Sequence, residues 1–535
     1  MPTSWPGAAT PFHVAPGYHP FVDHRYIHAG RARWLDAAGH EPNFWDRVPG
    51  PGWLTPAHQA VPHGVRLQLQ PAQKTEPFIR GDQPWENWIV DSVYTVIHDQ
   101  GRYRLWYEAA PEDLYDPQRR QNLPARDIWG VVLCYAESDD GLTWRKPELG
   151  LQEWNGSRAN NIVIGRQLVG PRGLMGAAVF RDDTAPAHQR YKCMFMGMTD
   201  KVPGLEGLPH PGTPVDPMTS HHGQTGIFAA TSPDGLGWTI HDKPIAWHFA
   251  DTGNVAEWDP ALQTYVWYTR GWSWGRRTIA RAETTDFHDW PLATPLVTAS
   301  PIDTPWSDIY TIGKTTYPGD PSTHLMFPNV YDRSADTTSV VALASADNIG
   351  WHLIPGGPCL QPGPRGSVDG GCVFAGTGLV DLPGDRIGIP YGAFPAPHKH
   401  APPGHGEGVA WATWPRGRLA GLVADHHAEF WTPPLHLEGA TLRLNAKTEA
   451  GGSIRVELQD EDWNPHEGFG LDQSTPIHGD HLDAPVTWDA TTQTVRGEPG
   501  RRTRRPESNH LPTDRPLVLR FQLHHATLFG FEVVK

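Results

Sequence analysis

Short apolar runs separated by turn residues recur along most of the chain, and no run has the length and period of a long amphipathic helix. From about residue 80 one order repeats: a polar start that often contains Asp, an apolar strand, a turn and an aromatic strand. The first repeat reads 91–97, 103–107 and 131–136. Five such repeats fit before residue 413, so the pattern predicts a series of antiparallel strands.

A short motif follows the third strand in four of these repeats. It consists of Ser or Thr, then Asp, often Gly, and a Trp that begins the next strand; the four copies occupy 136–144, 230–238, 282–290 and 344–351. The tryptophans lie about 50–90 residues apart, which matches one four-stranded propeller blade plus insertions. We therefore predict an all-β fold with a five-bladed β-propeller.

The character of the sequence changes after residue 431. Segments 440–444, 452–458 and 516–523 alternate apolar and polar residues with a period of two, as half-buried strands of a β-sandwich do. The predicted organisation is an N-terminal extension packed on the propeller (1–60), the propeller (61–431) and a C-terminal β-sandwich (432–535).

Composition narrows the classes of partner. The net charge of −15 argues against nucleic acid, and no apolar stretch approaches a membrane span. The 24 Trp and 14 Tyr residues suit strands and also provide faces on which sugar rings stack. The first residues do not form a signal peptide, so a cytoplasmic protein is expected. The four cysteines are widely spaced, which predicts buried free thiols. The sequence does not indicate an oligomeric state.

Acidic residues mark the starts of the predicted inner strands, which line the axis of a propeller and run in one direction. They are Asp91, Asp251, Asp308 and Asp369, with Glu86 just before the first. Side chains at these starts should converge on one funnel at the mouth of the channel. Carboxylates held close together repel each other, so that one stays protonated while its neighbour is ionised. That is the arrangement required for glycoside cleavage.

Two other roles for these aspartates stay open: capping of turns, and binding of a structural Ca²⁺ on the axis. Arg277 and Arg281 lie four residues apart on one strand and therefore point to one face. They could bind a substrate carboxylate or form surface ion pairs. Tyr391 lies at the end of a strand of the fifth repeat and His398 in the loop that follows, on the face where a lid would be. Trp85 and Trp88 could stack on sugars or fill the core between blades.

Five phrases of the chain resemble the glycoside hydrolases of family 32 and their relatives in families 43 and 68. They are YAESDDGLTWRKPELGL at 135–151, NNIV at 160–163, DTGNVAEWDP at 251–260, GRRTIARAE at 275–283 and GSVDGG at 366–371. The resemblance is to a bacterial subgroup that lacks the motifs of fructan-cleaving members. It implies a five-bladed propeller followed by a β-sandwich, and cleavage of a glycosidic bond.

The resemblance makes Asp91 the expected nucleophile or base. We further expect Asp251 to stabilise the transition state, and Glu86 or Asp369 to act as the general acid. The predicted substrate is a small oligosaccharide or glycoside, with water as acceptor and no organic cofactor. A phosphate-dependent phosphorylase and a non-catalytic glycan-binding protein are the alternatives. The expected substrate-binding residues are Asp308, Arg277, Arg281, Tyr391, Trp85, Trp88, Asn254 and His398.

Overall fold

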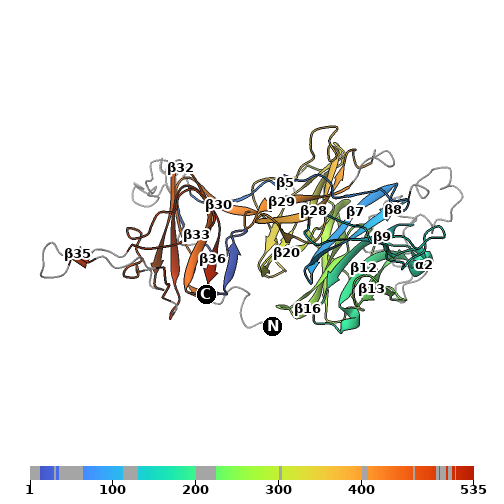
Figure 1. Cartoon of the computed structure of the whole chain (residues 1–535), viewed down its shortest axis with the longest axis horizontal. Coiled ribbons are helices and arrows are strands. Elements are labelled where there is room, and N and C mark those ends of the chain that lie inside the picture. Colours follow the sequence, from blue (N-terminus) through green and yellow to red (C-terminus); the bar gives the residue numbers. More distant parts are fainter. Residues whose placement is uncertain are drawn as a thin grey trace. The chain divides into compact units, whose positions relative to one another are not determined.

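The structure is a computed structural model, and it falls into two compact units (Figure 1). Unit 1 consists of Met1–Gln70, Ile354–Gly357 and Trp414–Lys535, and unit 2 of Pro71–Leu353 and Pro358–Thr413. The residues that the structure describes are 12–28, 32–34, 64–111, 130–199, 225–299, 304–399, 408–461, 464–489, 493–494, 502–503, 509–512 and 514–535.

The fold is all-β, as predicted, with 52% strand and 2% helix. Within the described ranges, helical structure is limited to the four-residue α2 (Arg166–Val169) and two 3-10 turns, Gly170–Arg172 and Ala187–Gln189. None of the described helices is long and apolar enough to cross a membrane.

Unit 2 contains five groups of antiparallel strands in chain order. Group one is β7 (Ile89–Asp99), β8 (Arg102–Ala110), β9 (Val132–Ser138) and β10 (Ile162–Ile164). Group two is β11 (Met175–Arg181), β12 (Tyr191–Met198), β13 (Thr225–Ser232) and β14 (Thr239–Ile240). Group three is β15 (Val255–Asp259), β16 (Thr264–Ser273), β17 (Arg276–Thr284) and β18 (Thr294–Val297).

Group four is divided into two sheets. One holds β19 (Ser307–Ile309), β22 (Asn329–Asp332) and β23 (Thr337–Val340); the other holds β20 (Thr315–Tyr317), β21 (Asp320–Met326), β24 (Leu343–Ser345) and β25 (His352–Leu353). Group five holds β26 (Cys372–Ala375), β27 (Val380–Leu382), β28 (Arg386–Phe394) and β29 (Gly408–Pro415). Two strands from the start of unit 2, β5 (Gln73–Lys74) and β6 (Ile79–Arg80), pair with β29 and complete group five.

Each group packs on the next through its own apolar cluster, and group five packs on group one. Pairs of large side chains that share a cluster show this: Trp106 and Phe195, Phe180 and Trp267, Tyr268 and Met326, Tyr331 and Phe374, and Trp411 and Tyr107. The five groups therefore form a closed series. The cysteines are free and buried, as expected.

The repeated sequence motif is a turn held together by side-chain caps. In the second copy, Ser232 Oγ accepts a hydrogen bond from the Gly235 N–H (2.9 Å), and Asp234 Oδ1 accepts from the N–H groups of Leu236 (2.9 Å) and Gly237 (3.0 Å). Such caps replace the backbone partners that a tight turn leaves unpaired. The turns that begin at Ser138 and Ser345 have the same Asp contacts.

The turn also connects neighbouring groups. The Gly235 carbonyl accepts hydrogen bonds from its own turn's Trp238 (3.1 Å) and from Trp106 of group one (2.8 Å). Gly235 has φ +76°, and a Cβ there would lie 2.6 Å from the Trp106 ring. Glycine is therefore required both for the backbone conformation and for the close approach of the indole.

Replacing Asp234 with Ala should destabilise the protein by about 0.5–2 kcal/mol, the range found when a capping side chain is lost. The urea midpoint of unfolding measures the change. Asp242→Ala is the matched control, because that carboxylate is 96% exposed and its ion pair with Arg172 is long (3.5 Å). Equal midpoints for the two variants would contradict the role of the cap.

Unit 1 is built on one large sheet in the order β3 (Ala32–Trp34), β30 (Ala420–Trp431), β36 (Val518–Val534), β32 (Thr441–Gln459) and β33 (Asp480–Pro485). The strand β2 (Gly17–Pro20) pairs with β36, and β4 (Arg66–Leu69) pairs with β30. Two small pairs complete the unit: β1 (Phe12–Val14) with β31 (Leu435–Leu437), and β34 (Gln493–Thr494) with β35 (Arg502–Thr503).

The sequence predicts that residues 1–60 pack on the propeller, but the N-terminal strands β2 and β3 pair with strands of unit 1, β36 and β30. β30 pairs with β36 only as far as Leu528, and β2 covers the following stretch, where its Gly17 is opposite Val533. This pairing uses backbone groups that an open strand edge would leave without partners. The division between the units lies at 70/71 and 413/414, whereas the sequence suggested 60/61 and 431/432.

Candidate functional site

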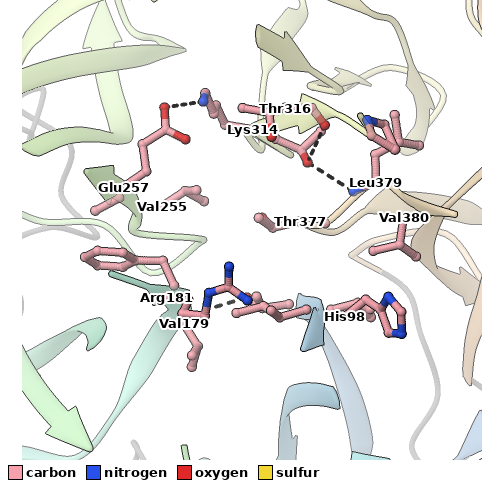
Figure 2. A pocket seen from close by; sticks show the side chains of 18 of the residues that line it. His98, Val179, Arg181, Val255, Glu257, Lys314, Thr316, Thr377, Leu379 and Val380 are labelled. Atoms are coloured by element: carbon pink, nitrogen blue, oxygen red, sulfur yellow. Dashed lines mark hydrogen bonds and ion pairs between the residues drawn. The ribbon is translucent and has the colours of Figure 1, made fainter. Parts of the chain in front are cut away.

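The first strands of the five groups surround two cavities in unit 2. We call the smaller one, of about 20 Å³, the waist cavity; it is lined by Val93, Tyr94, Ala178, Thr252, Gly253, Val255, Thr311, Ile312, Gly313, Ala375, Gly376 and Thr377. We call the larger one, of about 380 Å³, the far pocket; it is lined by residues 95–98, 179–181, 255–257, 314–316, 318–319 and 377–381 (Figure 2).

The order of these residues gives the direction of the strands. In every group the chain passes the waist cavity before it reaches the far pocket, for example from Val255 to Glu257 in β15 and from Gly313 to Lys314 in group four. The polar starts of the strands therefore lie at the end of the waist cavity that is opposite the far pocket.

At that end, charged side chains gather around Tyr310. The guanidinium groups of Arg270 and Arg277 lie 4.9 and 4.7 Å from the centre of the Tyr310 ring, and the Tyr310 hydroxyl is 2.9 Å from His398 Nε2. Cations over an aromatic face are attracted by its negative charge density. We call this set the Tyr310 cluster: Asp251, Arg270, Arg277, Asp308, Tyr310, Arg333 and His398.

Asp251 is the partly open carboxylate of the cluster. Its side chain is 28% exposed and forms an ion pair with Arg270, whose side chain is only 2% exposed. Arg270 also donates to Thr252 Oγ1 (2.8 Å), and Thr252 lines the waist cavity. A buried arginine with two fixed acceptors has little freedom, so it holds the partly exposed carboxylate in one place.

In contrast to the partly exposed Asp251, the side chain of Asp308 is completely buried, and it lies between two arginines. It accepts hydrogen bonds from Arg277 Nη1 (2.8 Å), from the Arg277 backbone N–H (2.9 Å) and from Arg333 Nε and Nη2 (2.8 and 2.7 Å). Burial alone would raise the pKa of Asp308, but the hydrogen bonds from Arg333 and Arg277 outweigh it and lower the pKa. Asp308 therefore stays ionised and positions the arginines.

His398 and its neighbour Lys399 complete this end of the unit. The Lys399 backbone N–H donates to Asp336 Oδ2 (2.9 Å), and the Tyr331 hydroxyl donates to Asp336 Oδ1 (2.7 Å). Burial, followed by the charges of Lys399 and Arg277, lowers the pKa of His398 to about 3. His398 is therefore a neutral hydrogen-bonding partner of Tyr310 at physiological pH.

An NMR titration of the imidazole nitrogens should show no protonation of His398 between pH 5 and pH 9, because its pKa lies near 3. The resonance is assigned by its loss in His398→Gln. A midpoint for His398 near the ordinary value of about 6.5 would contradict the burial and charge environment described above.

Glu86 lies in a different set of contacts. It accepts hydrogen bonds from the Tyr107 hydroxyl (2.6 Å) and from Lys146 Nζ (2.6 Å), and it is buried. Burial raises the pKa of Glu86, although Lys146 opposes the shift. Next to it, Trp85 is also buried and donates to Asn161 Oδ1 (2.9 Å). Trp88 packs against the apolar cluster between groups one and two.

Asp369 and Tyr391 contact each other but belong to another set of contacts. The Tyr391 hydroxyl donates to Asp369 Oδ2 (3.3 Å), Ser367 donates to Oδ1 (3.0 Å), and Lys74 forms an ion pair with the same carboxylate. Burial alone would raise the pKa of Asp369, but the Lys74 and Ser367 hydrogen bonds lower it. Asp369 is therefore an ionised group at neutral pH.

The remaining predicted residues have local partners. Arg281 donates to the Asn348 carbonyl (3.1 Å) and pairs with Glu283 (3.0 Å), so it does not share the partner of Arg277. Asn254 is buried and donates to the carbonyls of Gly176 (3.0 Å) and Ala250 (3.2 Å). The strand β7 runs through Asp91, whose side chain lies outside the described residues.

The structure thus brings together Asp251, Asp308, Arg277 and His398 from the predicted set. Sequence reasoning missed five residues of this end of the unit: Arg270, Tyr310, Arg333, Asp336 and Lys399. A usable signal was present for Tyr310, which follows Asp308 by two residues and therefore continues the same strand face. Arg270 lies within β16 and Arg333 directly follows β22, and only tertiary structure reveals their partners.

The carboxylates of Asp251, Asp308 and Asp369 each form an ion pair with an arginine or a lysine. In the described part of the chain, one group has donors close enough for a metal: Glu257, Asp259 and His324. The ammonium of Lys314 already lies there, bonded to Glu257 and 3.2 Å from His324 Nδ1.

No protein-family model matches the chain, and no curated protein is similar to it. Solved structures give weak similarities. The α-L-arabinofuranosidase of Podospora anserina in complex with cellotriose has 12% identity and a TM-score of 0.40, over 65% of this chain and 97% of that chain. A thermostable family-43 glycoside hydrolase has 12% identity and a TM-score of 0.39, over 63% and 92%. The exo-inulinase of Aspergillus awamori has 11% identity and a TM-score of 0.38, over 85% and 99%.

Proposed function

We propose that the protein is a glycoside hydrolase and that the Tyr310 cluster is part of its active site. In this proposal the five groups of unit 2 are the blades of a five-bladed propeller, and the C-terminal sheet of unit 1 belongs to a β-sandwich. The five apolar clusters support the propeller, because each is shared by consecutive groups and the fifth returns to the first.

The observation that carries the function is the pairing of Asp251 with Arg270. A partly exposed carboxylate that is fixed by a buried arginine can face a sugar ring without changing its own position. It would stabilise the positive charge that develops on the ring in the transition state. Asp308, from the first strand of group four, lies at the same end of the unit with its two arginines.

The second carboxylate of the reaction is Asp91 in this proposal. It lies in β7 two residues before Val93, which lines the waist cavity, and thus at the same end of its strand as Asp251. Asp91 would attack the anomeric carbon or activate the water molecule. Among the two candidates for the acid, the raised pKa of Glu86 suits a proton donor better than the lowered pKa of Asp369.

One observation favours phosphorolysis as the second candidate. Four cationic side chains lie at this end of unit 2: Arg270, Arg277, Arg333 and Lys399. They would suit inorganic phosphate as the acceptor in place of water.

A panel of aryl glycosides and small oligosaccharides distinguishes these functions when it is run with and without phosphate and with EDTA. A hydrolase releases sugar at the same rate in all three conditions. A rate that depends on phosphate, with a sugar phosphate as product, establishes the phosphorylase. Loss of activity in EDTA would reveal a metal requirement, and binding without turnover across the panel would contradict both enzymes.

A further inference from the structure

The far pocket is the larger of the two cavities named above, and the proposed reaction does not use it. Its volume of about 380 Å³ lies within the range of ~300–1,000 Å³ that is usual for small-molecule sites. All five groups contribute to its wall, from His98 and Arg181 on one side to Lys314 and Leu379 on the other (Figure 2). Because every group contributes to the wall, the pocket depends on the whole fold and not on a single loop.

The waist cavity separates this pocket from the Tyr310 cluster. Its volume of about 20 Å³ holds roughly one water molecule, so a sugar ring cannot pass. The constriction is built into the backbone: a Cβ on Gly313 would lie 2.8 Å from the Phe327 carbonyl, and one on Gly376 would lie 2.9 Å from the Tyr94 carbonyl. A ligand in the far pocket therefore binds independently of a substrate at the cluster.

A buried ion pair forms one wall of the far pocket. Lys314 is buried and bonds to Glu257 Oε1, which also accepts a hydrogen bond from Asn348 Nδ2 (2.8 Å). In the described residues, Oε2 of Glu257 forms no hydrogen bond, and Figure 2 shows the Glu257 side chain at the edge of the open space. Glu257 therefore presents one fixed acceptor oxygen to a ligand.

The two cations of the wall are already paired. Arg181 pairs with Asp99 (2.8 Å) and Asp183 (2.7 Å), and Lys314 is neutralised by Glu257. The wall also carries a further carboxylate, Asp381, which would repel an anionic ligand. A charged ligand would have to compete with these pairs, whereas a neutral one would not. The Lys314 ammonium also occupies the position that a metal ion would take between Glu257 and His324.

The rest of the wall mixes hydroxyl groups with apolar surface. Thr316 and Thr377 supply hydroxyls, and Val179, Val255 and Leu379 supply apolar contacts. A sugar has the same two properties, since its ring edges carry hydroxyls and its faces carry C–H groups. We propose that the far pocket is a second binding site, for a neutral saccharide of about one ring, with Glu257 Oε2 accepting from a sugar hydroxyl.

Isothermal titration calorimetry of the full chain tests the proposal with D-glucose, D-galactose, D-xylose and L-arabinose, and with D-glucuronate as the anionic comparison. We expect at least one neutral sugar to bind and glucuronate to bind more weakly. Glu257→Gln should weaken binding about tenfold, because a charged acceptor forms the stronger hydrogen bond. Thr377→Val, which keeps the shape of the side chain, should weaken it about fivefold.

Two controls keep the result specific. Glu283→Gln removes a carboxylate of the same group that does not line the pocket, and it should leave binding unchanged. Asp251→Asn should also leave it unchanged, because Asp251 lies beyond the waist cavity. The proposal is overturned if no sugar binds, or if Asp251→Asn abolishes binding that Glu257→Gln preserves. Absence of glycoside turnover would refute the proposed enzyme and not this site, since calorimetry measures binding alone.

Discussion

Replacing Asp251 with Asn is expected to lower kcat by about 10²–10³-fold on any glycoside that the wild-type protein cleaves. The amide keeps the size of the side chain and can still accept a hydrogen bond from Arg270. It no longer carries the negative charge that would stabilise a positively charged sugar ring. The measurement is the steady-state rate on the best substrate of the glycoside panel.

Asp425→Asn is the matched control for this loss of activity. Asp425 also pairs with an arginine, Arg66, but in unit 1 and with both side chains half exposed. Its replacement removes the same charge and should leave kcat unchanged. A wild-type kcat in Asp251→Asn would refute the catalytic role of the carboxylate.

Replacing Asp308 with Asn is expected to reduce the free energy of unfolding by about 2–4 kcal/mol. Removing one partner of a buried ion pair usually costs about 3–5 kcal/mol, and partial exposure of Arg333 reduces this cost. The variant leaves Arg277 and Arg333 facing a neutral amide. Urea unfolding at pH 7 measures the difference, and Asp242→Asn, whose carboxylate is 96% exposed, should change it by less than about 0.5 kcal/mol.

The effect of Asp308→Asn should also depend on pH. Because the pKa of Asp308 is lower in the folded protein than in the unfolded chain, its ionised form stabilises the fold above the unfolded pKa, and this contribution is lost as the pH falls through the folded pKa. The gap between wild type and variant should therefore narrow in acid. A gap that stays constant down to pH 2 would mean that packing, and not charge, accounts for the loss.

Much of the fold could be predicted from the sequence because its signals are local. The alternation of apolar and polar residues located β7, β8 and β9, and the cap residues Ser138 and Asp140 identified a turn that the structure reproduces. The boundaries of the units were harder to predict. β4 and β30 look like any other strand in the sequence, and only their pairing places them in unit 1.

The candidate site was predicted in part for the same reason. Strand starts are local features, so Asp251 and Asp308 could be proposed together. Their partners were not predictable, because Arg270 and Arg333 reach them from other strands. Asp369 shows the limit of the approach: it also precedes an inner strand, but Lys74, far away in the sequence, pairs with it.

The completion of group five by β5 has a consequence for synthesis on the ribosome. The backbone N–H of Trp411 donates to Thr75 Oγ1 across 336 residues. At the usual 5–20 residues per second, about 20–70 s pass between the appearance of β5 and that of its partner β29. Until then the nascent chain has an unpaired N-terminal strand and a series of sheets that cannot close.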